Sequence, residues 1–377
     1  MADRRRVFLV SALALVLLAA GGCSALQMEA ARVLADIGAG AGPSALKERT
    51  PTPLRMPVAY RVDGRDYRGD FYRPGEEPLA AMVLVPGAAP AGKDDPRLVA
   101  FATTLARARF AVLVPDMPGV REFRLRASNV REIADAVRYL SGTRVGRDGV
   151  GIAAISYAAG PAVLAAADPE IAGRVRFVLA IGGYHDLEAV LTFFTTGFYR
   201  ERPGAPWRYR APNAYGKWVF ARSNVELLVD PVDRALLAEM ARRKLRDLEA
   251  DIGDLTGRLG REGRTVEALL ANDDPERVSA LLAALPAAIR THLHGLDLKG
   301  RDLSGLEAQL VLIHGRDDVV IPYTESVALA AAVPPGQADL YLVDNLAHVD
   351  IRRAGFGDEL TLWEAVYRLL ELRDAAT

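Results

Sequence analysis

Short runs of consecutive apolar residues recur along the chain, separated by stretches with helical periodicity. The apolar runs cover residues 81–85, 111–114, 150–155, 175–181, 310–314 and 339–343. Strands that are apolar at successive positions are expected to be buried on both faces, as in a parallel sheet. Stretches suited to helices follow most of the runs, over residues 97–109, 129–140, 157–167, 324–332 and about 359–372. This alternation predicts an α/β fold with a doubly wound, mostly parallel sheet.

The segment before the first apolar run has a different pattern. Residues 58–72 alternate between apolar and polar positions, and Asp63-Gly64 separates two strand-like halves, which predicts a β-hairpin. We place the start of the folded domain near Leu54. Residues 24–53 are interpreted as a linker: a short helix within 24–42 followed by extended chain around Thr50-Pro51-Thr52-Pro53, because proline disfavours helix at the preceding residue.

One long interval, residues 186–300, breaks the alternation of strands and helices. It contains no convincing buried strand, and Asp230-Pro231 and Asp274-Pro275 resemble helix starts. A three- and four-residue spacing predicts one amphipathic helix carrying Leu245, Leu248, Ile252, Leu255 and Leu259. We therefore expect a helical cap at 186–300, inserted between core segments 54–185 and 301–377.

The N-terminus has the layout of an export signal. Residues 4–6 are arginines, residues 7–20 are apolar apart from one serine, and Ala20-Gly21-Gly22 leads into Cys23. Small residues ending at a cysteine resemble a bacterial lipobox. That resemblance implies removal of residues before Cys23, lipidation of Cys23, and a membrane-anchored lipoprotein on the periplasmic side of the envelope or in the outer membrane.

Composition narrows the function classes. The formal net charge is −1 and only 7% of residues are aromatic, so the chain offers no basic surface for nucleic acid. Its single cysteine excludes an internal disulfide and a cysteine-rich zinc site. Neither a zinc-protease motif nor a glycine-rich phosphate loop occurs, so we expect no metal and no cofactor.

Ser156 is the candidate nucleophile. It follows a buried strand directly and precedes a helix of small residues, which is the context of a nucleophile elbow. The usual elbow sequence is G-x-S-x-G, whereas Ala154 and Ala158 stand at the two glycine positions here. The alternative is a serine that caps a helix after a strand.

The segment His314-Gly315-Arg316-Asp317-Asp318-Val319-Val320-Ile321-Pro322 resembles the acid loop of α/β hydrolases, H-G-x-x-D-x-x-[VI]-P. The resemblance implies that Asp318 is the catalytic acid, with Asp317 as the rival, and that His314 shapes the loop. After the last apolar run, His348 occupies the position at which these hydrolases carry their base.

The order Ser156, Asp318, His348 is that of α/β-hydrolase triads. The resemblance implies a serine hydrolase acting on a small ester or acyl substrate through an acyl-enzyme, most simply a carboxylesterase. Its oxyanion hole would use the backbone N–H groups of Ala88, or alternatively Ala89, and of Tyr157. Two other readings stay open: a small-peptide peptidase of prolyl-oligopeptidase type, and a non-catalytic envelope protein on the same scaffold.

The remaining histidines have less definite roles. His185 is expected either to line the substrate pocket or to be structural, and His292 and His294 are expected to pack within the insertion or lie at the surface.

Overall fold

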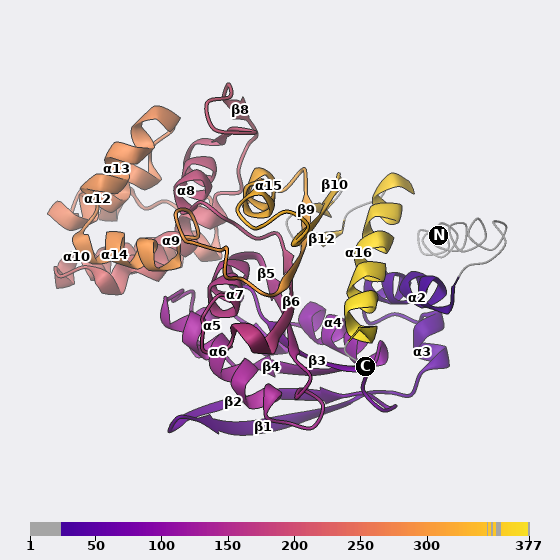
Figure 1. The fold of residues 1–377 in the computed structure, drawn as a ribbon. Helices are drawn as coiled ribbons and strands as arrows, with labels where there is room; N and C mark the ends of the chain where they lie inside the picture. Colours follow the sequence, from indigo (N-terminus) through magenta and orange to yellow (C-terminus); the bar gives the residue numbers. More distant parts are fainter. Residues whose placement is uncertain (1–23, 345, 348–349, 352–355, 376–377) are drawn as a thin grey trace.

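The computed structural model describes residues 24–344, 346–347, 350–351 and 356–375; Cys23 and His348 therefore lie outside the described residues. Its centre is an eight-stranded sheet in the order β1-β2-β4-β3-β5-β6-β9-β10 (Figure 1). The strands are β1 (Leu54–Val62), β2 (Arg65–Arg73), β3 (Ala80–Val85), β4 (Phe110–Pro115), β5 (Val150–Ile155), β6 (Val175–Ile181), β9 (Gln309–Gly315) and β10 (Ala338–Val343). Strand β2 runs antiparallel to both of its neighbours, β1 and β4. The strands β4, β3, β5, β6, β9 and β10 all run parallel to one another. The predicted fold class is confirmed.

The hairpin between β1 and β2 forms at the predicted place. Asp63 and Gly64 have φ values of 45° and 79°, the pair of positive angles that a type I′ turn requires. Strands β3 and β4 are buried at every position, as their continuous apolar runs predict.

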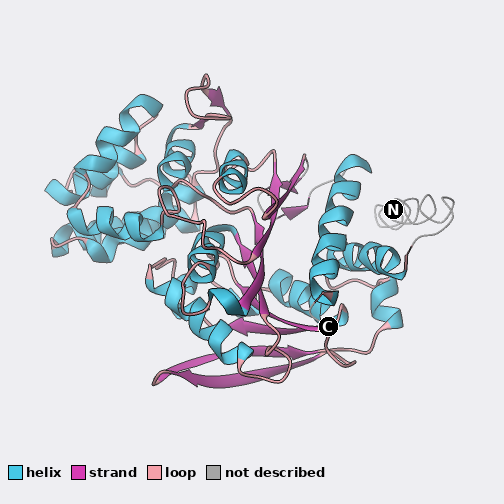
Figure 2. Cartoon of the chain, in the orientation of Figure 1, coloured by secondary structure: helices cyan, strands magenta, loops and turns pink. Residues whose placement is uncertain are grey.

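Helices cover both faces of the sheet (Figure 2). One face packs against α6 (Ser128–Ser141), α7 (Ala159–Ala166) and α15 (Thr324–Ala331). The other packs against α2 (Ala25–Ala39), α4 (Pro96–Arg107) and α16 (Phe356–Asp374). Two shorter helices, α3 (Ala45–Arg49) and α5 (Pro118–Arg121), complete the core.

The interpretation of residues 24–53 as a linker is wrong, because α2 and α3 pack onto the core. The Trp363 indole donates to the Gln27 carbonyl at 3.1 Å, and buried Arg373 forms an ion pair with Glu29 at 2.5 Å. Asp36 is fully buried and accepts from Thr104 Oγ1 at 2.6 Å. These contacts join α2 to α16 and α4, so α2 is part of the α/β core.

The interval between β6 and β9 is mostly helical. It contains α8 (Leu187–Thr196), α9 (Tyr215–Asn224), α10 (Pro231–Arg246), α11 (Gly253–Thr256), α12 (Arg261–Leu270), α13 (Val278–Ala284) and α14 (Ala287–Leu296). A short hairpin that the sequence did not predict, β7 (Phe198–Tyr199) with β8 (Arg208–Tyr209), extends from it. Helices α10 and α12 to α14 lie together at one end of the molecule, on the opposite side of the sheet from α2 and α16 (Figure 1).

The single amphipathic helix expected through Leu259 is wrong. Helix α10 ends at Arg246, and the Asp247 carboxylate accepts from the Glu249 N–H at 3.0 Å in a local turn that competes with helix. Leu255 and Leu259 are nevertheless buried in the core of the cap. The apolar positions do pack in the cap, but Leu245 lies in α10, Leu255 lies in α11, and the others lie in the connecting segments.

Within the described ranges, none of the helices combines the length and the apolar character needed to cross a membrane.

Candidate active site

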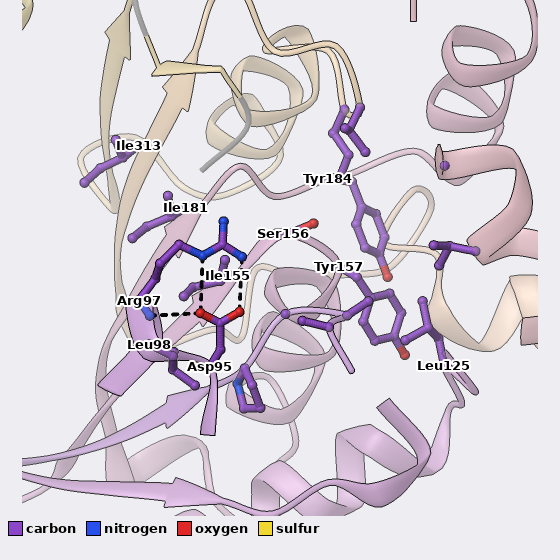
Figure 3. Close-up of a pocket in the computed structure, with 18 of the residues that line it drawn as sticks. Asp95, Arg97, Leu98, Leu125, Ile155, Ser156, Tyr157, Ile181, Tyr184 and Ile313 are labelled. Atoms are coloured by element: carbon purple, nitrogen blue, oxygen red, sulfur yellow. Dashed lines mark hydrogen bonds and ion pairs between the residues drawn. The ribbon is translucent and has the colours of Figure 1, made fainter. Parts of the chain in front are cut away.

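Ser156 occupies a sharp turn between β5 and α7. Its φ is +57°, in the left-handed region that residues with a side chain rarely adopt. Strain of this kind persists where surrounding structure enforces it, and it is concentrated at functional sites. The turn leaves Ser156 half-buried, where it lines a cavity (Figure 3).

The two alanines of the elbow fit without glycine. Ala154 is fully buried between Val85 and Ala180 of the adjacent strands, and Ala158 packs into the core beneath α7. The tight position is Gly160, where an added methyl group would lie 2.2 Å from the Tyr184 ring. A position that admits only glycine therefore lies two residues beyond the usual one, at Gly160 instead of Ala158.

Asp318 is held rigidly at the end of β9. It is 1% exposed, and its Oδ1 accepts from the N–H groups of Val320 at 2.7 Å and Ile321 at 3.0 Å. These bonds fix the plane of the carboxylate. The rival Asp317 is more exposed, and its Oδ1 is buried without a hydrogen-bond partner among the described residues.

His314 lies beneath the acid loop, where it contacts Ser326 Oγ through Nδ1 at 2.7 Å and the Ile321 carbonyl through Nε2 at 3.0 Å. A carbonyl only accepts, so Nε2 carries a proton. Asp318 Oδ2 lies 3.4 Å from the same nitrogen. His314 is fully buried and holds the loop, as its place in the motif implies.

The chain just before His348 lies against the acid loop. Leu346–Ala347 (β11) pairs with Asp350–Ile351 (β12), and the Arg316 N–H donates to the Val343 carbonyl at 2.7 Å. A methyl group on Gly315 would lie 1.7 Å from the Leu346 carbonyl oxygen, so only glycine permits this approach. Leu346 also lines the cavity that contains Ser156.

The loop after β3 passes beside the elbow. A methyl group on Gly87 would lie 3.2 Å from the Ile155 carbonyl oxygen. Ala88, Ala89 and Tyr157 all line the cavity, and the Tyr215 hydroxyl donates to the Ala88 carbonyl at 3.2 Å. The residues whose backbone groups are proposed for an oxyanion hole thus line the same cavity as Ser156.

The cavity has a volume of about 930 Å³ and a largely apolar lining. His292 of α14 lines it, although the sequence suggested a surface or packing role. Burial and the nearby Arg126 lower the pKa of His292 to about 4.

His185 lies instead at the base of the cap, where its carbonyl accepts from Lys299 N at 3.0 Å. Among the described residues, no group of three or more His, Cys, Asp or Glu side chains could hold a metal ion.

No protein-family model and no curated protein sequence matches this chain. Solved structures match it in fold. A protein described as a hydrolase from Legionella pneumophila is 12% identical with a TM-score of 0.52, over 87% of this chain and 93% of that one. The rice cell wall degrading esterase of Xanthomonas oryzae is 12% identical with a TM-score of 0.50, over 84% and 89%. A 2,6-dihydroxy-pseudo-oxynicotine hydrolase is 17% identical with a TM-score of 0.47, over 84% and 68%. At these identities the likeness concerns the fold alone, which is of the α/β-hydrolase type.

Proposed function

We propose that this protein is a serine hydrolase of the carboxylesterase kind, with Ser156 as nucleophile, His348 as general base and Asp318 as the acid that orients His348. The observation that carries the proposal is the left-handed conformation of Ser156 (φ +57°) at a strand-to-helix turn that opens into an apolar cavity. A serine that only caps a helix has no need of that strain.

The mechanism follows from these positions. Ser156 Oγ attacks the carbonyl carbon of an ester while His348 removes the hydroxyl proton and then returns it to the departing alcohol. The N–H groups of Tyr157 and of Ala88 or Ala89 stabilise the oxyanion. Water activated by His348 then hydrolyses the acyl-enzyme and releases the acid.

Two histidines, His348 and His292, are candidates for the base. The lowered pKa of His292 supports the choice of His348. His292 lines the cavity, but its lowered pKa means that it accepts a proton poorly at neutral pH. His348 follows β10, which pairs with β9 beside the acid loop, and Leu346, two residues before it, lies against Gly315 of that loop. We therefore assign the base to His348.

The test is labelling of the full chain by a fluorophosphonate, with hydrolysis of p-nitrophenyl butyrate followed in parallel. Ser156→Ala and His348→Ala are expected to lower turnover by about 10³-fold or more, whereas His292→Ala keeps it within about tenfold. Absence of both labelling and turnover in folded wild-type protein would refute the proposal. Loss of activity in His292→Ala alone would transfer the role of base to His292.

We further propose that Cys23 is lipidated and that the enzyme is a membrane-anchored lipoprotein of the bacterial cell envelope, on the periplasmic side or in the outer membrane. The support is the arrangement of arginines, an apolar run and small residues before Cys23. Incorporation of labelled palmitate and partition into the detergent phase should both be lost in Cys23→Ser. Equal partition of the two proteins would contradict the anchor.

A further inference from the structure

The cavity around Ser156 extends in two directions that differ in chemistry. In Figure 3, Ile155, Ile181 and Ile313 lie on one side of Ser156, and Tyr157 and Tyr184 lie on the other. The three isoleucines are direct cross-strand neighbours at the ends of β5, β6 and β9. They therefore form a continuous apolar floor on the face of the sheet that carries α2, α4 and α16.

The walls above this floor come from those three helices. Apart from Arg97, whose charge pairs with Asp95, they supply aliphatic and aromatic side chains, among them Leu34, Ile37, Leu98, Phe101, Leu362 and Val366. We call this part of the cavity the α2–α16 arm. The ion pair of Asp95 and Arg97 at 3.1 Å lies at its edge, where Arg97 is 66% exposed to solvent. The charged groups are thus paired with each other at the rim.

The other part of the cavity, which we call the cap arm, has polar groups. Ser223 and Asn224 of α9 and His292 of α14 line it. Asn224 is 2% exposed, its amide nitrogen donates to the Phe220 carbonyl at 2.8 Å, and its Oδ1 has no hydrogen-bond partner among the described residues. An unsatisfied buried acceptor disfavours an apolar chain and favours a ligand that brings an N–H or O–H group.

We propose that the substrate is a long-chain acyl ester whose acyl chain occupies the α2–α16 arm and whose polar alcohol occupies the cap arm. This inference rests on the serine hydrolase function proposed above. Apolar side chains line both arms, but with Ser156 between them an ester carbonyl has its two substituents directed into surroundings that differ in the buried polar groups they offer: Ser223, Asn224 and His292 lie on the cap side alone. An apolar arm binds a hydrocarbon chain because burial removes each methylene from water.

The gain with chain length is measurable. Burial of one methylene is worth about 0.8 kcal/mol, which corresponds to about a fourfold rise in kcat/KM per methylene while the arm is filled. From butyrate to octanoate, four added methylenes therefore predict a rise of about 10²-fold or more.

Two valines of nearly equal burial provide a matched pair of variants. Val366 of α16 lines the α2–α16 arm and is 7% exposed, whereas Val219 of α9 lines the cap side and is 8% exposed. Val366→Trp obstructs the acyl arm, and Val219→Trp obstructs the cap arm. Ile37→Phe, on the half-buried surface of α2, obstructs the acyl arm from a second helix and guards against misfolding of the first variant.

The experiment measures kcat/KM of the full chain for p-nitrophenyl butyrate, octanoate and dodecanoate. The wild type should prefer the longer chains. In Val366→Trp and Ile37→Phe the ratio of kcat/KM for dodecanoate to that for butyrate should fall tenfold or more, and Val219→Trp should keep the preference for long chains. Wild-type turnover with no gain beyond butyrate, or a loss of the preference only in Val219→Trp, would overturn the acyl arm.

A binding measurement separates failure of this inference from failure of the proposed function. Calorimetric titration of Ser156→Ala with dodecanoate should show binding that Val366→Trp abolishes. If the wild type hydrolyses no ester but this binding is seen, the proposed function fails and the apolar arm stands. If the wild type hydrolyses esters but folded Ser156→Ala does not bind dodecanoate, the acyl arm is overturned and the proposed function stands.

Discussion

Glu325 is a buried carboxyl group at the junction between the core and the cap. It lies at the start of α15, is 3% exposed, and its Oε2 accepts from the N–H groups of His185 at 3.0 Å and Asp186 at 2.7 Å. Burial raises its pKa from 4.5 to about 8, and the neighbouring Asp186 and Asp297 add to the shift. The substitution Glu325→Gln removes the titratable group and keeps an oxygen that can accept both N–H groups.

The sign of the effect follows from the direction of the shift. Below pH 4.5 the group is protonated in the folded and the unfolded chain, so its full contribution to stability is present. As the pH rises through 8 this contribution is lost, because the folded chain must bury the ionised form. The interval from 4.5 to about 8 corresponds to about 5 kcal/mol, at about 1.4 kcal/mol for each pKa unit.

Urea denaturation at pH 5, 7 and 9 tests this reasoning. The difference in unfolding free energy between Glu325→Gln and the wild type should be small at pH 5 and should grow by several kcal/mol in favour of the variant by pH 9. The exposed Glu307→Gln is the matched control and should show no such growth. A difference that stays constant with pH, or a variant that is less stable at pH 9, would refute the reasoning.

Three further substitutions test the site and its support. Asp318→Asn should lower kcat for p-nitrophenyl butyrate by about 10³-fold or more while Asp317→Asn stays within about tenfold, and the reverse result would make Asp317 the acid. Gly160→Ala places a methyl group 2.2 Å from Tyr184 and should lower the unfolding free energy by about 1–3 kcal/mol in chemical denaturation. The control Gly257→Ala has no atom within 4 Å of the new methyl group and should change this free energy by less than about 0.5 kcal/mol. Equal effects of the two substitutions would contradict the packing argument. Arg373→Met leaves Glu29 without its buried ion-pair partner and should lower the unfolding free energy by about 3 kcal/mol, while an unchanged value would mean that α2 contributes little to the domain.

The sheet could be predicted because its strands have strong local signals. Each apolar run in residues 80–115 became a strand buried at every position, and Asp63-Gly64 supplied the two residues that a type I′ turn favours. The role of α2 could not be predicted in the same way. Its buried positions, Ala30 and Val33, form a narrow stripe, and its anchor Arg373 lies more than 300 residues away in the sequence. Its attachment depends on tertiary contacts that leave no local pattern.

The site was predictable where a motif carries its own geometry. A strand, a serine and a helix of small residues placed Ser156, and the acid-loop motif placed His314 and Asp318 at the end of β9. Two features had no sequence signal. His292 reaches the cavity only because the cap folds back over the sheet, and α2 forms a cavity wall only because it packs beside α16.

Identification of the residue that forms a covalent adduct tests the central claim most directly. The full chain is treated with a fluorophosphonate and digested, and the modified peptide is sequenced by mass spectrometry. Ser223 is the internal control, since it also lines the cavity but is only 3% exposed and exchanges hydrogen bonds with the Leu125 backbone at 3.0 and 3.1 Å. We predict a single adduct on Ser156, absent in His348→Ala. An adduct on Ser223, or none on folded protein, would contradict the assignment of Ser156 as the nucleophile.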